Sequence, residues 1–302
     1  MQDEQKPTAP DDAGRVIAGR YQLHERIASG AVGVLYAATQ LSNQRRVAVK
    51  LLHPSQVNDP QLTERFRREG MVLSRLKSPH TITTYEFDCD SDGTLYIVME
   101  RPEGPNLGEV LELEGAIAWV RTLRILLGLC DALAEAHELG IVHRDLRPEN
   151  CVLESRLVTA DFVKVLDFGL AWLASPQAAI SQPGQTIGAM AYASPEQLLK
   201  QPIDARSDVY GIGLLAYQLL VGRHPFADTF GPGKLVEAHL RTIPPAPSLA
   251  RAEIPRDVDE LVARCLEKDP ERRFPNATAL GAMINIALLA LGPQSSDTIR
   301  DR

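Results

Sequence analysis

The chain has 302 residues, 44% of them hydrophobic, which is enough apolar material to bury one large core or two smaller lobes. Its formal net charge of -7, without a broad basic stripe, excludes a general nucleic-acid surface, because such binding needs clustered basic residues that neutralise phosphates. Its four cysteines are widely spaced and form no C-x-x-C pair, which argues against a zinc site or disulfide framework and favours a reducing, cytoplasmic setting.

A first lobe rich in strands is predicted for residues 20–101. Residues 1–19 before it are polar, lack the apolar run of a signal peptide, and are expected to be disordered. Alternating apolar residues predict strands, and apolar residues at helical spacing predict one helix. The strands are Tyr21 to Ile27, Val34 to Thr39, Arg46 to Leu52, Thr83 to Phe87 and Leu95 to Met99, and the helix is Pro60 to Leu76. Ser91-Asp92-Gly93 is the predicted hairpin turn between the last two strands.

A second lobe, mainly helical, is predicted for residues 102–291, after Pro102, Gly104 and Pro105 interrupt regular structure. Its predicted helices are Trp119 to Leu139, Asp208 to Leu220, Asp257 to Leu266 and Ala277 to Leu291, and its hairpin strands are Cys151 to Leu153 and Val163 to Leu166. The apolar stretch near the end is much shorter than the roughly 20 residues of a membrane-spanning helix, so a core helix is expected there. Residues 292–302 form a polar tail.

The most specific signal is His143-Arg144-Asp145-Leu146-Arg147-Pro148-Glu149-Asn150, followed by Asp167-Phe168-Gly169. Phosphoryl transfer needs a carboxylate beside the attacking hydroxyl, oxygen ligands for Mg²⁺ and cations around the phosphates. Asp145 offers the carboxylate, Asn150 and Asp167 offer the oxygens, and Arg147 offers a cation. The two segments therefore predict a phosphotransfer site.

Two upstream features fit this chemistry but are ambiguous alone. Gly30 and Gly33 lie between two strands, where glycines let backbone N–H groups approach phosphates, although a simple hairpin turn explains the isolated pattern better. Lys50 ends an apolar strand and Glu69 lies on the next predicted helix, so that together they can fix nucleotide phosphates. The alternatives are a snorkelling lysine and a solvated helix face. The order of all these motifs along the chain favours the phosphate-binding interpretation.

Taken together, these motifs resemble those of the eukaryotic-like (Hanks-type) serine/threonine protein kinases, and their residue sequences are most similar to the bacterial branch of that family. The resemblance covers Tyr21 to about Leu291. It implies an α+β, bilobal protein-kinase fold with a small β-rich lobe that carries one helix and a larger, mainly helical lobe. It also implies ATP and Mg²⁺ as cofactors and proteins as substrates.

The resemblance assigns roles to individual residues. Asp145 orients the substrate hydroxyl, Asn150 and Asp167 bind Mg²⁺, and Arg147, Lys50 and Glu69 complete the catalytic set. Nucleotide binding is assigned to Ile27, Ala28, Gly30, Gly33, Leu35, Ala48, Lys50, Met99, Glu100 and Val152, with Met99 as gatekeeper. Arg144 implies control by phosphorylation of the activation loop, for which Ser181 and Thr186 are candidate sites. Glu196 is expected to pair with Arg273, and Asp208 to brace the catalytic loop.

Four positions depart from the family pattern. Ala28 replaces a glycine, Arg147 replaces a lysine near the γ-phosphate, and Ala189 replaces a threonine whose hydroxyl bridges catalytic residues. Pro102 lies three residues after Met99, where the hinge ordinarily donates a backbone N–H to adenine. Because proline has no N–H, Glu100 is left as the hinge partner through its carbonyl, and we expect ATP to bind a few-fold more weakly.

The predicted function is Mg²⁺- and ATP-dependent phosphorylation of serine and threonine in proteins, including the chain's own activation loop. Arg147 and Ala189 favour an alternative, a pseudokinase-like signalling scaffold with weak or no turnover. A third interpretation, a kinase of small molecules, is disfavoured by the segment Ser194-Pro195-Glu196, which resembles a protein-substrate platform. By analogy with the family, the small lobe is a candidate homodimer surface.

Overall fold

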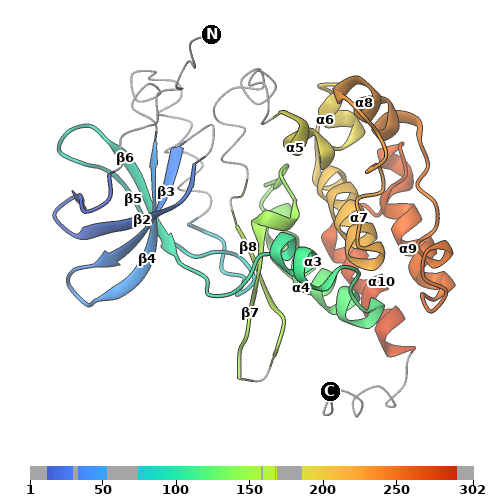
Figure 1. Ribbon diagram of the computed structural model, residues 1–302, viewed down its shortest axis with the longest axis horizontal. Coiled ribbons are helices and arrows are strands. Elements are labelled where there is room, and N and C mark those ends of the chain that lie inside the picture. Colours follow the sequence, from blue (N-terminus) through green and yellow to red (C-terminus); the bar gives the residue numbers. More distant parts are fainter. Residues whose placement is uncertain are drawn as a thin grey trace, which may run out of the picture. The chain divides into compact units, whose positions relative to one another are not determined.

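The computed structural model describes residues 12–29, 33–52, 74–157, 159–166, 168 and 186–290, apart from the side chains of residues 186, 187 and 189. The chain forms two compact units (Figure 1). The first contains Thr83–Arg101 and the described residues up to 75, and the second contains Leu76–Ile82 and the described residues from Pro102 onward. Leu76–Ile82 belongs to the second unit because its backbone pairs there: Ile82 donates its N–H to Val165 O at 3.0 Å, and His80 O accepts from Val165 N at 2.8 Å.

The first unit is an antiparallel sheet with strand order β1-β2-β3-β4-β6-β5. Its strands are β1 (Val16–Ile17), β2 (Tyr21–Ser29), β3 (Gly33–Gln40), β4 (Arg45–Leu52), β5 (Thr84–Cys89) and β6 (Leu95–Glu100). The five predicted strands are confirmed as β2 to β6, and the two-residue β1 was too short to show a periodicity. Of the predicted helix from Pro60 to Leu76, only residues 74–76 are described, and they contain a turn.

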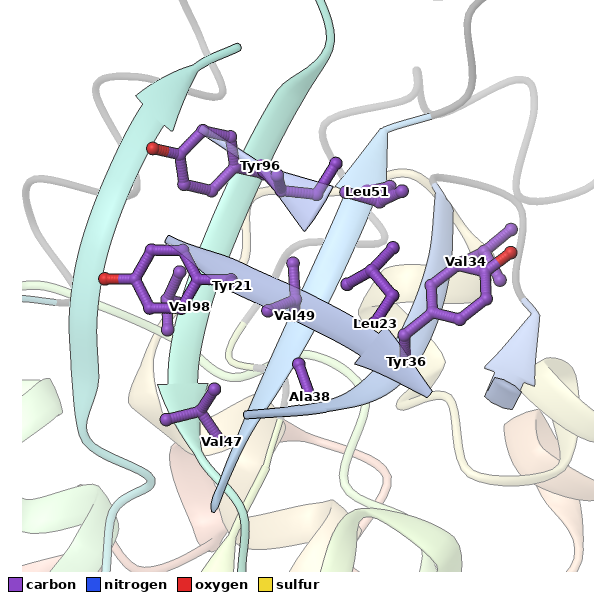
Figure 2. Packing of buried hydrophobic residues seen from close by; sticks show 11 residues of the cluster. Tyr21, Leu23, Val34, Tyr36, Ala38, Val47, Val49, Leu51, Tyr96 and Val98 are labelled. Carbon is purple, nitrogen blue, oxygen red and sulfur yellow. The ribbon is translucent and has the colours of Figure 1, made fainter. Parts of the chain in front are cut away.

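One face of this sheet carries the hydrophobic core of the unit (Figure 2). The cluster takes side chains from β1, β2, β3, β4 and β6, and includes Tyr36 and Tyr96, both without exposed surface. Along β4, Val47, Val49 and Leu51 belong to it, so the residues between them lie on the other face. The alternation that predicted the strands is therefore the alternation between the core and the opposite face.

The turn between β5 and β6 forms where the sequence predicts it. Gly93 has φ of +87°, a backbone conformation that glycine adopts at little cost, and its N–H bonds to Asp90 O at 2.9 Å. The Asp92 carboxylate accepts from Thr94 N at 2.9 Å. These local bonds fix the register that places Cys89 opposite Leu95.

The second unit is mainly helical, with one short hairpin. Its helices are α3 (Leu107–Glu114), α4 (Trp119–Glu138), α5 (Thr186–Ala191), α6 (Pro195–Leu198), α7 (Ala205–Val221), α8 (Pro232–Arg241), α9 (Arg256–Cys265) and α10 (Ala277–Leu289), and its strands are β7 (Cys151–Glu154) and β8 (Phe162–Val165). Single 3-10 turns lie at Pro148–Asn150, Pro247–Leu249 and Pro270–Arg272. The four predicted helices and the hairpin are confirmed, which agrees with the α+β prediction. None of the helices in the described part of the chain is both long and apolar enough to cross a membrane.

Helix α7 is the centre of this unit, buried along almost its whole length and packed against α4, α9 and α10 (Figure 1). It begins three residues before its predicted start because Asp204 caps it, accepting from Arg206 N at 2.9 Å. It ends at Gly222, which has φ of +81°. A Cβ on Gly213 would lie 2.7 Å from Cys265 Cβ, so a glycine here lets α7 and α9 approach closely.

Candidate active site

The segment that carries Asp145 has no regular structure, and α7 holds its backbone in place. The Asp208 carboxylate, 1% exposed, accepts from His143 N at 2.8 Å and from Arg144 N at 2.9 Å. His137 also donates Nε2–H to Asp208 at 2.8 Å, since its Nδ1 accepts from Ala277 N. A buried carboxylate is stable only when it is well hydrogen-bonded, and these three donors provide that. The expected contact between Asp208 and the loop is thus present.

The imidazole of His143 links the loop to the strand that precedes Asp167. Its Nδ1 accepts from Asp145 N at 3.3 Å, which leaves Nε2–H to donate to Leu166 O at 2.8 Å. Leu166 in turn donates its N–H to Asn150 O at 2.9 Å. The backbone just before Asp167 is therefore bonded to both ends of the loop. Asp167 itself lies outside the described residues.

Asp145 and Asn150 are in direct contact. Asn150 Nδ2 donates to the Asp145 backbone carbonyl at 2.8 Å and to its Oδ2 at 3.1 Å. The two side chains meet because the 3-10 turn Pro148–Asn150 folds the chain back, and Asn150 N closes that turn on Arg147 O at 3.0 Å. The structure therefore brings the proposed base and one proposed metal ligand together.

Arg147 forms an ion pair with a residue for which the sequence suggested no role. Its Nε donates to Glu149 Oε2 at 2.6 Å. Burial opposes ionisation of Glu149, but the hydrogen bond and the charge of Arg147 outweigh it and lower the pKa of Glu149. The guanidinium also reaches α5, where a Cβ on Gly188 would lie 3.7 Å from Arg147 Nη2. The loop that carries Asp145 thus also carries a positive charge that its partner Glu149 holds in place.

Glu196 and Arg273 form the ion pair that the family resemblance implies. Arg273 Nη1 and Nη2 donate to Glu196 Oε1 and Oε2 at 2.7 and 2.9 Å, and the pair is buried. Ser207 Oγ donates to the same carboxylate at 2.6 Å. Arg273 also donates to the carbonyl oxygens of Arg206, at 2.9 Å, and of Glu267, at 2.8 Å. Burial acts to raise the pKa of Glu196, yet these donors outweigh it and lower that pKa. Through the bonds to Ser207 and Arg206, the pair connects α6, the start of α7 and the segment before α10.

In the first unit, predicted nucleotide-binding residues share one face of the sheet. Directly paired residues of antiparallel strands point to the same side. Leu35 pairs with Ala28 and Lys50, and Ala48 pairs with Met99. Leu35, Ala48, Lys50 and Met99 alternate along their strands with the core residues of Figure 2, so they lie on the face opposite the core cluster, and Ala28 lies there through its pairing with Leu35.

The other predicted residues of the first unit follow different constraints. Gly33 is required sterically, because a Cβ there would lie 2.0 Å from Leu51 O. Ile27 is 47% exposed and lies at a register irregularity of β2. Glu100 uses its N–H to bond Thr83 O at 2.8 Å. Val152, in the second unit, is buried in β7.

Five further predictions cannot be placed at the level of side chains. Gly30, Glu69 and Ser181 lie outside the described residues, and Thr186 and Ala189 are described only as backbone of α5. Their roles stay predictions.

Sequence reasoning missed two contacts, one at the end of α5 and one made by α6. His224 Nε2–H donates to Ala191 O at 2.9 Å, and its Nδ1 accepts from Phe226 N at 3.1 Å. Gln197 donates to Arg144 O at 2.8 Å. Neither contact leaves a signal in the sequence, although Ser194 and Gln197 have the spacing of a helix capping box.

Comparison with known proteins supplies the context for this geometry. A family model described as "Protein kinase domain" matches residues 21–282. The serine/threonine-protein kinase pkn3 of Myxococcus xanthus is 36% identical, over 91% of this chain and 51% of its own length. The serine/threonine-protein kinase PksC of Streptomyces coelicolor is 39% identical, over 89% of this chain and 49% of its own. The chain thus spans about half the length of these relatives. The solved kinase domain of Mycobacterium tuberculosis PknI has a TM-score of 0.70 and 27% identity, covering 92% of this chain and 98% of that one.

Proposed function

Since the chain belongs to the protein kinase family, we propose that it transfers the γ-phosphate of ATP to serine and threonine hydroxyls of proteins, including its own activation segment. The resemblance inferred from its motifs and the predicted kinase fold are confirmed. Specificity for serine and threonine is supported by the names of the curated relatives and by the residue sequence of the catalytic loop.

The observation that carries the proposal is the contact between Asp145 and Asn150 on a loop whose backbone Asp208 holds. Asp145 is positioned to accept the proton of a substrate hydroxyl, and the Asn150 bond to its Oδ2 limits the rotation of that carboxylate. Arg147, held by Glu149, would keep positive charge near the transferred phosphate. In this arrangement the protein contributes positioning and electrostatic stabilisation, which is what phosphoryl transfer demands.

The donor set fits a magnesium ion. Asn150 donates its Nδ2–H groups to Asp145, and its side-chain amide oxygen has no hydrogen-bond donor in the described part of the chain. An amide oxygen and a carboxylate are ligands that Mg²⁺ prefers, and the backbone before Asp167 is bonded to Asn150 O. We assign Asn150 and Asp167 to the metal, which when bound would neutralise phosphate charge.

We assign the nucleotide to the sheet face that holds Ala28, Leu35, Ala48, Lys50 and Met99. That face is set by strand register and lies opposite the hydrophobic core. Ile27, Gly30, Gly33, Glu69, Glu100 and Val152 complete the proposed set. Homodimerisation through the first lobe and a cytoplasmic location are parts of the proposal that rest on the family and on cysteine usage. Cys151 is fully buried in β7 and this burial raises the pKa of its thiol, so we assign it as a small core residue and not as a reactive thiol.

Mass spectrometry of the purified chain after incubation with Mg²⁺ and ATP tests the proposal, beside Asp145→Asn. General-base catalysis contributes about 10²- to 10⁴-fold, so the variant should lose at least 99% of the transfer. Phosphate on serine or threonine of the native chain alone supports the proposal, and phosphate on Ser181 or Thr186 would identify the switch. No incorporation above the variant, with nucleotide still bound, would refute it and support the scaffold alternative. Small-molecule acceptors in a parallel assay test the third interpretation.

A further inference from the structure

Gln197 connects the segment that follows α5 to the catalytic loop through both ends of its side-chain amide. Its Nε2 donates to the backbone carbonyl of Arg144, 53 residues earlier in the chain, at 2.8 Å. Its Oε1 accepts from Ser194 N at 3.0 Å, and its own N–H bonds back to Ser194 Oγ at 3.4 Å. Gln197 therefore completes the capping box of α6 and holds the loop at the same time.

The carbonyl that Gln197 binds belongs to a backbone position under strain. Arg144 has φ of +68°, in the left-handed region that side chains other than glycine rarely adopt because Cβ approaches the following carbonyl oxygen. Such a conformation persists only where the surroundings hold it. Asp208 holds the N–H of Arg144 at 2.9 Å, and Gln197 holds its carbonyl.

The same peptide group continues into Asp145. The carbonyl of Arg144 and the N–H of Asp145 form one rigid plane, and that N–H donates to His143 Nδ1 at 3.3 Å. Gln197 and His143 therefore fix the two ends of the plane. Because the plane is attached to the Asp145 Cα, its orientation fixes where that Cα lies, and the Asn150 bond to Oδ2 then restricts the direction of the carboxylate.

Gln197 is itself held firmly. Its neighbour Glu196 forms the buried ion pair with Arg273, and Ser207, at the start of α7, donates to the same carboxylate. The donor to Arg144 thus comes from a short helix that the core of the unit anchors, which is what an accurate position for the loop requires.

We propose that Gln197 is a positioning residue for Asp145, an inference that rests on the proposed function. The structure gives this role to the Nε2 donor specifically. Glutamate at this position would preserve the capping box, since a carboxylate accepts from Ser194 N as the amide oxygen does, but it has no N–H for Arg144 O.

Two matched variants separate positioning from simple stability. Gln197→Glu removes the donor to Arg144 and keeps the cap, whereas Ser194→Ala removes the capping hydroxyl and keeps the donor. In steady-state assays with ATP and a protein substrate, we expect Gln197→Glu to lower kcat about tenfold, with the KM for ATP within twofold and little change in Tm. We expect Ser194→Ala to lower Tm by a few degrees and to lower kcat much less than Gln197→Glu does.

Hydrogen exchange provides a readout that does not depend on phosphate transfer. The peptide covering residues 141–147 should exchange faster in Gln197→Glu than in the native chain, and at the native rate in Ser194→Ala. Native kcat and native exchange in Gln197→Glu would overturn the inference, as would a loss of kcat that follows Tm equally in both variants. If the native chain transfers no phosphate, the proposed function fails, and exchange alone then decides whether Gln197 holds the loop.

Discussion

Removing Arg273 should destabilise the second unit strongly, and the structure allows the size of the effect to be worked out. The Arg273 side chain has no exposed surface and Glu196 is 5% exposed. In Arg273→Met the side chain keeps much of its volume, but the buried carboxylate loses both hydrogen bonds of the pair. Breaking a buried pair by removing one partner costs about 3–5 kcal/mol. Because Arg273 also donates to three backbone carbonyls outside the pair, we expect the upper part of that range, about 4–5 kcal/mol.

This loss corresponds to a drop in Tm of about 8–20 °C for a unit of this size, measurable by calorimetry or circular dichroism. The double variant Arg273→Met/Glu196→Gln should be more stable than Arg273→Met alone, because it leaves no unpaired buried charge. Equal stability of the single and double variants at pH 8 would refute the reasoning, since the cost would then come from packing and not from the charge.

The pH dependence gives a second check. In the native chain the pKa of Glu196 is lowered, so its contribution to stability is present above the ordinary glutamate value of about 4.3 and is lost as the pH falls through the folded value. Without Arg273, burial is left as the main influence and raises that pKa above the ordinary value. The stability deficit of Arg273→Met against the native chain should therefore be larger at pH 8 than at pH 5.5. A deficit independent of pH would contradict this account of the pair.

The remaining predictions concern the hinge and the histidines His224 and His239. Pro102→Val restores a backbone N–H and should tighten nucleotide binding a few-fold in a calorimetric titration; unchanged affinity would count against the hinge argument. Burial lowers the pKa of His224 to about 4 and that of His239 to about 3. The unfolded chain therefore binds protons near pH 6.5 that the folded chain does not, and stability should fall as the pH falls toward 4, by about 2 kcal/mol for each histidine between pH 7 and pH 5. Urea unfolding of His224→Asn should show a shallower decline, and an unchanged decline would exclude His224 as its source.

The predictable part of this molecule is the part in which local pattern and chemistry agree. The strands β2 to β6 and the long helices α4, α7, α9 and α10 follow from periodicity, since each buries one face or its whole surface. Helix α3 was missed because eight residues give little periodicity, although Asn106 and Glu109 form a capping box that can be read from the sequence. Helix α8 was missed because Pro232 and Gly233 at its start look like a loop.

The candidate site likewise contains residues that the sequence predicts and contacts that it does not predict. Asp145, Asn150 and Asp208 are found through motifs whose residue types the chemistry requires. The contacts of Gln197 with Arg144 and of His224 with Ala191 end on backbone carbonyls, and a sequence does not show which distant carbonyl needs a donor. The pair of Arg147 and Glu149, two residues apart, was within reach of sequence reasoning, but a segment without regular structure leaves the direction of both side chains open.

Asp208 links the position of the catalytic loop to the packing of the buried helix α7. An aspartate on a helix as buried as α7 would be unstable without donors, because an unpaired charge in the interior is costly. Its donors are His137 and the backbone N–H groups of His143 and Arg144, and Arg144 is the residue with the strained φ of +68°. The strain and the buried charge are each unfavourable alone, and each is offset by the same hydrogen bonds. Substituting Asp208 would therefore release the loop as well as remove a charge, which ties the position of Asp145 to the packing of α7.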